Sequence, residues 1–254
     1  MKLKIAELYA QLQLAFPPNG DFFSSIAENF FPTPKFYSRG GRALEAIQYD
    51  VEQLTIDSSF TPEAIQHAYD HYKIIPLRRF NPDTNILIIG CGNYPLSDSG
   101  GNALNLKKHD AIEYRSEHAH MNAITLDPCM SKNPTIVGML GWQPLAPYFK
   151  GKRFEKIVLE GVNLFGDSNL RYLMSDLEAL LDPHGLIIGA YSKGRSLCYT
   201  LETFRNAYAC TDQQKCFSWA VWVEDYFDDL DGREVYEYIN AHSEHPEVKQ
   251  NYSA

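Results

Sequence analysis

Two glycines at alternate positions, Gly90 and Gly92, follow the four branched apolar residues Ile86–Ile89. Such a run is too short for a helix face and too continuous for a half-exposed strand, so it predicts a central strand buried on both faces. Glycines directly after that strand let the backbone turn tightly and approach a ligand without an intervening side chain. We therefore expect a cofactor-binding loop. Its residues are Gly90, Cys91, Gly92, Asn93 and Tyr94.

The residues after this loop limit the choice of cofactor. A dinucleotide fingerprint requires a third glycine at the position of Pro95, so the sequence argues against NAD. A P-loop is excluded because no Gly-Lys-Ser/Thr sequence follows. A tight turn between strand and loop, without any ligand, is the structural alternative.

A second chemical signal is an acid at the end of a later strand. Asp127 ends the run Ala123–Asp127, and Pro128 terminates the strand directly after it. An acid that binds ribose hydroxyls usually follows the glycine loop by about 20 residues, so Asp127 implies an insertion. Glu113 lies at the ordinary distance and is the alternative. We favour Asp127, because residues 123–126 are the better strand formers.

Three further side chains are candidates for catalysis: His118, His120 and Asn163. The two histidines alternate, so an extended backbone places both imidazoles on one side, where they could accept a proton or contact substrate. Surface histidines are the alternative, as a turn asparagine is for Asn163. No G-x-S-x-G or H-E-x-x-H motif is present, and we predict no resident metal.

The elements that must position these residues alternate between strands and helices. One helix has an apolar stripe of leucines, with Asp167 or Ser168 as its cap and Asp182–Gly185 at its end. The stripe consists of Leu170, Leu173, Leu177, Leu180 and Leu181. Strands are predicted at 86–89, 123–127, 134–139, 154–160 and 186–191, then a helix at 196–208 and an antiparallel hairpin of 217–223 with 235–239. Helices are also predicted at 3–16, 43–54 and 62–72.

This order of elements resembles the class I S-adenosylmethionine (SAM) dependent methyltransferases across residues 80–192. Gly90–Tyr94 resembles their motif I, Phe154–Gly161 resembles their motif IV, and Leu181–Ile188 resembles the run that leads into their fifth strand. The resemblance implies an α/β, Rossmann-like fold. It would have a mostly parallel seven-stranded sheet, helices on both faces and an N-terminal helical extension.

The resemblance also implies SAM as the cofactor, bound at the ends of the strands. The implied binding residues are Gly90, Cys91, Gly92, Asn93, Tyr94, Asp127, Pro128, Met139, Leu140, Glu160 and Gly161. Met139 departs from the family pattern, which often has an acid there to accept from the adenine amino group. The implied function is methyl transfer to a small molecule or a protein side chain. A non-catalytic binding or interaction module with the same fold is the alternative.

Three parts are predicted along the chain: a helical and aromatic extension at 1–79, a SAM-binding domain at 80–241 and a flexible tail at 242–254. Within the extension, residues 22–36 are rich in phenylalanine and proline, and either pack as a loop or form a lid. The insertion at 97–122 leaves the cofactor edge of the sheet, so we expect it to cover the active site.

Composition limits the possible partners. The chain has 254 residues and a formal net charge of -9, which argues against nucleic acid, because phosphate binding needs a basic footprint. Its five cysteines are odd in number and have no C-x-x-C spacing, which indicates a protein of the reducing cytoplasm. No apolar run approaches the roughly 18 residues of a membrane span, so no membrane partner is expected.

Overall fold

The computed structural model describes residues 1–15, 51–52, 54, 56–90, 123–128, 130, 134–160, 170–192, 195–210, 219–223, 232–242 and 251–252. The predicted aromatic segment at 22–36 and the predicted cover at 97–122 lie outside these ranges, as does most of the tail.

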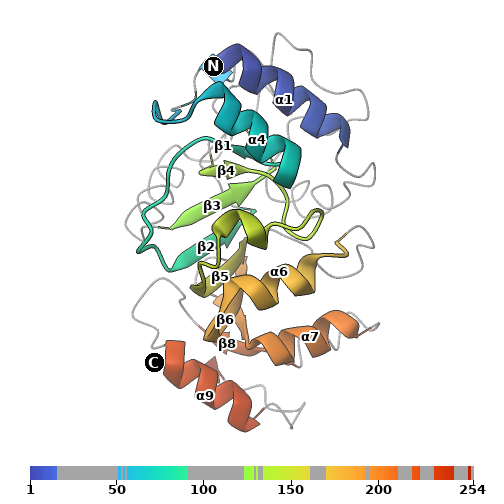
Figure 1. Ribbon diagram of the computed structural model, residues 1–254. Coiled ribbons are helices and arrows are strands. Elements are labelled where there is room, and N and C mark those ends of the chain that lie inside the picture. The colour runs from blue at the N-terminus through green and yellow to red at the C-terminus, as the bar shows by residue number, and fades with distance from the viewer. Residues whose placement is uncertain are drawn as a thin grey trace.

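The fold is α/β and is built on one mixed sheet (Figure 1). The strand order is β1-β4-β3-β2-β5-β6-β7-β8-β9. The strands are β1 Ile75–Pro76, β2 Ile86–Ile89, β3 Ile124–Asp127, β4 Ile136–Val137, β5 Phe154–Glu160, β6 Leu181–Ser192, β7 Arg195–Tyr199, β8 Val221–Val223 and β9 Asn251–Tyr252.

The parallel part of the sheet consists of the adjacent strands β4, β3, β2, β5 and β6. These five strands confirm the strands predicted between residues 86 and 191. In β2, Leu87 and Ile89 belong to one hydrophobic cluster, whereas Ile88 belongs to another. Because successive side chains of a strand point to opposite faces, β2 is buried on both faces, as its continuous apolar sequence predicts.

The predicted count of seven strands is wrong, because the described residues give the sheet nine strands. The sheet is mixed, so its mostly parallel character is only partly as predicted: β8 also pairs with β9 in parallel, but antiparallel pairs occur at both ends. β1 is antiparallel to β4 at one end, and β7 is antiparallel to both β6 and β8 at the other. The predicted helix at 196–208 is only partly right. Its first residues form β7, and helix α7 (Leu201–Ala209) begins after Thr200, which forms a capping box with Thr203.

The predicted strand at 235–239 is also wrong, because these residues lie in helix α9 (Gly232–His242). Val235 and Ile239 are both buried, and their spacing of four places them on one helical face. There they pack with Ile88, Val158 and other residues of the sheet. The branched and aromatic residues that predicted a strand therefore form the apolar face of a helix instead.

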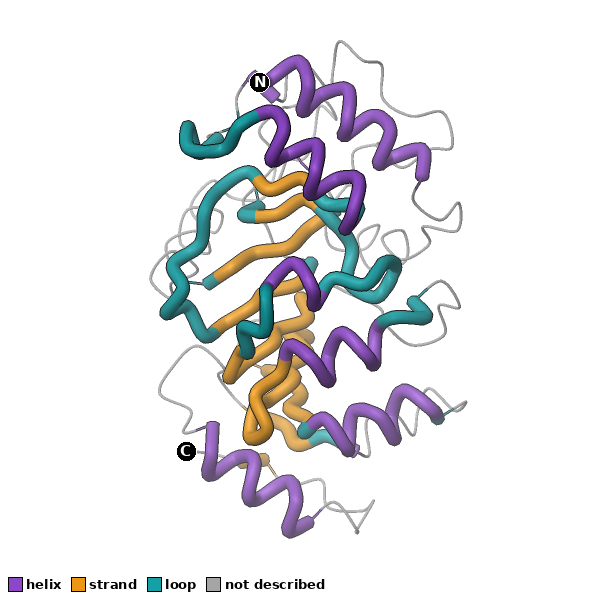
Figure 2. The backbone as a smooth tube through the Cα atoms, in the orientation of Figure 1, coloured by secondary structure: helices purple, strands orange, loops and turns teal. Residues whose placement is uncertain are grey.

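Helices cover both faces of the sheet. Helix α6 (Leu173–Leu180), helix α7 and the short 3-10 helix η5 (Ala146–Phe149) contribute to the cluster that contains Leu87 and Ile89, and α6 and α7 lie side by side in Figure 2. Helix α9 packs on the opposite face. All five leucines of the predicted stripe are buried, but the predicted helix is too long. Helix α6 begins after Tyr172 without a side-chain cap and ends at Leu180, so Leu170 precedes it, and Leu181 with the predicted helix end at Asp182–Gly185 lies in β6.

The N-terminal helices pack at the β1 end of the sheet. Helix α1 (Lys2–Ala15) and helix α4 (Pro62–Tyr72) share a cluster with Ile75 and Val137. The predicted start of α4 is confirmed: Pro62 occupies its first turn, and the hydroxyl of Thr61 accepts from the Ala64 N–H at 3.2 Å. The segment that precedes residue 80 is thus joined to the sheet through β1.

Candidate functional site

The carboxyl ends of the parallel strands bring three predicted site residues to one level. Ile89 in β2 pairs with Leu126 in β3 and with Leu159 in β5. The next residue on each strand is Gly90, Asp127 or Glu160, so the backbones of these three lie in one row across the edge of the sheet. In open α/β sheets, ligands bind outside this edge.

Gly90 is the first residue of the predicted cofactor loop. Its N–H donates to the carbonyl of Leu126 at 2.9 Å, which continues the ladder between β2 and β3 by one residue. Its φ of 79° is left-handed, a conformation that glycine adopts without the steric penalty of a Cβ. The backbone therefore bends at Gly90, directly after the last residue of β2.

Asp127 ends β3, beside Gly90. Its side chain is fully buried, and Pro128 after it is also buried. Its backbone carbonyl accepts from the Gly138 N–H at 3.1 Å, which ties the end of β3 to the end of β4. A buried carboxylate at this edge has the charge and the position that a ribose-binding acid requires. The alternative acid, Glu113, lies outside the described residues.

The residues after β4 are closely packed and apolar. A Cβ on Gly138 would lie 2.7 Å from Cγ2 of Ile74, so only glycine fits there without displacement. Met139 is half-buried against the main core, and Leu140 is buried in it. The end of β4 thus contributes a thioether and an aliphatic side chain, and no acid, to this edge.

The chain beyond Leu140 is fixed by Asp176 of α6, which is 2% exposed. The N–H of Leu145 donates to its two carboxylate oxygens at 2.9 and 3.1 Å, and the N–H of Ala146 donates to Oδ1 at 2.9 Å. Burial raises the pKa of Asp176, whereas backbone hydrogen bonds from Ala146, Leu145 and Gly141 act to lower it. Asp176 therefore anchors the 141–146 segment to α6.

Gly141 makes the second attachment of this segment. Its carbonyl accepts from the Tyr172 N–H at 2.9 Å, and its φ is 79°. A Cβ at this position would lie 2.9 Å from Cβ of Leu173. The close approach to the start of α6 and the left-handed backbone both require glycine.

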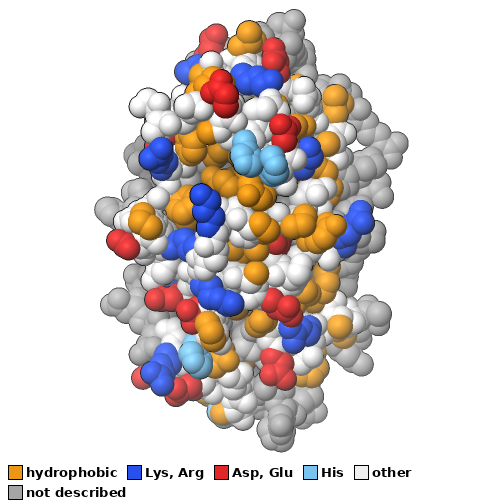
Figure 3. Space-filling model, viewed as in Figure 1, with side chains coloured by type: hydrophobic (Ala, Val, Ile, Leu, Met, Phe, Trp, Pro, Cys, Tyr) orange, Lys and Arg blue, Asp and Glu red, His pale blue; other side chains and the backbone are white. Residues whose placement is uncertain are grey.

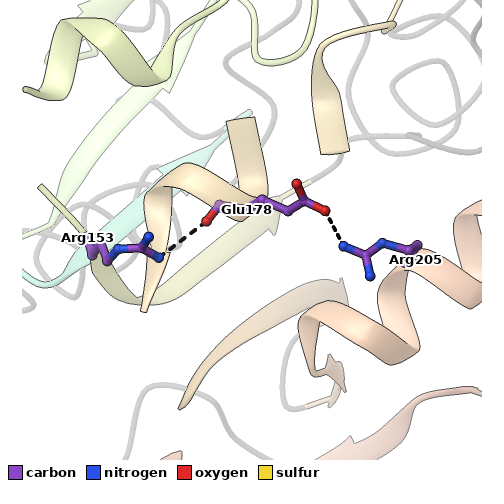
Figure 4. A network of polar contacts seen from close by, with 3 residues as sticks. All are labelled: Arg153, Glu178 and Arg205. Carbon is purple, nitrogen blue, oxygen red and sulfur yellow. Dashed lines mark hydrogen bonds and ion pairs between the residues drawn. The ribbon is translucent and has the colours of Figure 1, made fainter. Parts of the chain in front are cut away.

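Two arginines bind residues at the C-terminal end of helix α6 (Figure 4). Arg153 donates from Nη1 to the carbonyls of Glu178 and Leu181, at 3.3 and 2.5 Å, and so binds carbonyls at the helix C-terminus. The carboxylate of Glu178 pairs with Arg205 of α7. Residues just before β5 and in α7 thus fix the helix that carries Asp176.

Several predicted site residues lie outside the described part of the chain. These are Cys91, Gly92, Asn93, Tyr94, His118, His120, Gly161 and Asn163. Glu160 is described only as a backbone position of β5. The structure therefore brings together Gly90, Asp127, Pro128, Met139 and Leu140, with the backbone of Glu160 beside them.

Asp176 and Gly141 are the two residues of this region that the sequence reasoning missed. A signal for Asp176 was present, because it lies three residues after Leu173 and one before Leu177, on the face of α6 that holds the leucine stripe. An acid among the apolar positions of a helix needs a buried partner. Its partners are backbone N–H groups. Because every residue except proline has one, the residue types of a sequence do not show which of them will bind the acid.

Among the described side chains, Cys198 of β7 could in principle act as a nucleophile. Burial raises the pKa of its thiol to about 12, so it stays protonated at neutral pH and is inert. No group of three or more His, Cys, Asp and Glu side chains within the described ranges is placed to hold a metal ion.

Comparisons of this chain with family models, with curated proteins and with solved structures found no match. Over the described residues, none of the helices has both the length and the apolar character needed to cross a bilayer.

Proposed function

We propose that this protein is a SAM-dependent methyltransferase with a Rossmann-like, class I core. The observation that carries the proposal is the position of Gly90 beside Asp127. Gly90, with a left-handed backbone, follows the central parallel strand, and Asp127, a buried acid, ends the neighbouring strand at the same level. The parallel order β4-β3-β2-β5-β6 supports it, because it places the ends of β2 and β3 at the centre of the carboxyl edge.

The residues at this edge have separate roles in the proposal. Gly90 allows the backbone to turn so that the loop after it approaches the amino-acid part of SAM. Asp127 accepts from the ribose hydroxyls, and its burial strengthens these hydrogen bonds by excluding water. Leu140 and the half-buried Met139 offer an apolar surface for the adenine ring. SAM supplies an activated methyl group, so the protein needs chiefly to bind, align and exclude water.

The acceptor belongs to a small molecule or a protein side chain. The net charge of -9 argues against nucleic acid as the acceptor, since a polyanion would be repelled. We place the activity in the cytoplasm, in keeping with the odd number of cysteines and their spacing.

A non-catalytic binding module with the same fold is the second candidate. Met139 favours it, because the end of β4 has no acid to accept from the adenine amino group. In that case the edge would bind its ligand or a protein without turnover. Transfer of a labelled methyl group from SAM to any acceptor separates the two candidates.

The direct test is calorimetric titration of the full chain with SAM. Replacing Asp127 by Ala should weaken binding by about 1.5 to 3 kcal/mol, the scale of a lost charge-assisted hydrogen bond. Asp127→Asn keeps the volume of the side chain and shows whether the negative charge is what matters.

The matched control is Asp83→Ala. Asp83 is exposed and precedes β2, so it lies at the opposite, amino edge of the sheet. This variant should bind SAM as the parent chain does. If a folded Asp127→Ala protein kept full affinity, or if the parent chain did not bind SAM at all, the proposed function would be wrong.

A further inference from the structure

Helix α4 presents two histidines at the spacing of one helical turn. His67 and His71 are both exposed, and their Nδ1 atoms lie 2.8 Å apart. Their ring centroids are 3.9 Å apart, with an angle of 64° between the ring planes. Figure 3 shows two histidine side chains side by side over α4, at the surface and among hydrophobic side chains.

Two nitrogens so close can share only one hydrogen between them. Nδ1 of His71 is also 2.9 Å from the carbonyl oxygen of His67, which places the hydrogen of the pair on His71. The Nδ1 of His67 then directs a lone pair toward this hydrogen. The two Nδ1 atoms thus face one another, and a metal ion bound by both nitrogens can take the place of this hydrogen.

We propose that His67 and His71 form a chelating site for a divalent first-row transition metal. Two histidines at i and i+4 on one helix face are a known way to hold such ions, and imidazole suits nickel, copper and zinc. With metal–nitrogen bonds of about 2.0–2.1 Å, nitrogens 2.8 Å apart subtend roughly 90° at the metal.

The N–metal–N angle of roughly 90° favours some coordination geometries over others. A tetrahedral ion would need the two nitrogens about 3.3 Å apart for bonds of about 2.0–2.1 Å, which requires the rings to separate. Octahedral or square-planar ions accept cis ligands at right angles, as nickel and copper do. The remaining coordination positions are open to water, because both rings are at the surface.

The surroundings of the pair suit a cation. The chain has a formal net charge of -9, which favours the approach of cations over anions. Tyr72 lies beside both histidines, at 6.5 and 6.1 Å between ring centroids, and Tyr148 packs against Tyr72 at 5.6 Å. Burial raises the pKa of Tyr148 to about 12, so its phenol stays neutral and adds no anionic ligand. Tyr148 therefore does not compete with the two imidazoles as a ligand.

The test is titration of the full chain with nickel chloride at pH 7.5 in a buffer that does not bind metal, followed by calorimetry. One nickel ion should bind at micromolar concentrations. His71→Gln and His67→Gln should each weaken this step by at least about tenfold, since even the loss of a group that supports a ligand costs about 10–100-fold. Glutamine is a good helix former, so helix α4 should be retained, and circular dichroism checks this.

Two control variants make the outcome decisive. His184→Gln removes another exposed histidine, which packs against Tyr236 at 5.2 Å, and should leave nickel binding unchanged. His118→Gln combined with His120→Gln removes the alternate pair that the sequence singles out. This second variant should also bind nickel as the parent chain does. The proposal is wrong if the His67→Gln/His71→Gln protein binds nickel as the parent chain does, or if the parent chain binds no nickel.

Discussion

The two halves of the sheet, which meet at β6, differ in what they can do. From β4 to β6 the strands are parallel, so each one ends at the same edge and each connection must leave from it. From β6 to β8 the strands are antiparallel and successive ones end at opposite edges. The parallel half therefore gathers the ends of five described strands at one edge. Beyond β6, the antiparallel strands β7 and β8 extend the sheet, and β9 pairs with β8 in parallel at its far end.

The largest expected effect is on the parallel half, through Asp176. Replacing it by Ala leaves the N–H groups of Leu145 and Ala146 buried without an acceptor, and should lower the free energy of unfolding by about 3 kcal/mol. Urea unfolding measures the loss.

The control for this variant is Glu178→Ala on the same helix. Glu178 is about half exposed and pairs with Arg205, so its loss should change stability by about 1 kcal/mol or less. Equal losses in the two variants would mean that Asp176 does not anchor the 141–146 segment.

A medium effect compares the carboxyl edge of the parallel half with the opposite face of the same sheet. Ile89→Val and Ile239→Val each remove one buried methylene, and each should lower the free energy of unfolding by about 1 kcal/mol. Ile89 precedes Gly90 at the convergent edge, whereas Ile239 packs on the other face from α9. Only Ile89→Val should also weaken SAM binding, as measured by calorimetry. Weaker SAM binding in Ile239→Val would show that the two regions are energetically coupled.

The smallest effect concerns pH. Burial raises the pKa of Asp176 above its usual value of 3.8, so the folded protein holds this proton more tightly than the unfolded chain does. The contribution of this group to stability is therefore largest below pH 3.8 and falls as the pH rises through the folded pKa. Asp176→Asn removes the titration. As the pH rises from about 4 toward neutrality, the free energy of unfolding of the parent chain should therefore fall relative to that of Asp176→Asn. A difference that is constant with pH would mean that the three backbone hydrogen bonds cancel the effect of burial.

The parallel half was predictable because its sequence signals are local. Ile86–Ile89 and Phe154–Glu160 are continuous apolar or alternating runs with clear ends, so the positions of β2 and β5 follow from the chain itself. Gly90 and Asp127 were then placed by position alone, since the residue after a parallel strand must lie at the carboxyl edge. The predicted residues that the structure describes therefore lie along one edge of the sheet, whereas Asp176 and Gly141, which depend on contacts between distant segments, were not predicted.

The antiparallel half was not predictable in the same way. Val235 and Ile239 are compatible with a strand by residue type and with a helix by spacing, and packing against Ile88 and Val158 decides for the helix. The predicted helix at 196–208 included most of β7, because the capping box at Thr200 that separates strand from helix depends on a side-chain contact. Tertiary contacts that no local pattern encodes therefore set the elements after β6.

The short strand β1 has a consequence for how this protein behaves at high concentration. An uncovered sheet edge presents rows of unpaired N–H and C=O groups, on which another chain can add a strand and begin to aggregate. Here the edge strand has only two residues, and one of them, Pro76, has no N–H to offer. The carbonyl of Leu77 just beyond it already accepts from the Asp57 N–H at 2.9 Å, and α1 and α4 pack beside it. Among the described strands, the outermost one at this end is therefore a poor template for a second copy, and helices α1 and α4 shield it from intermolecular association.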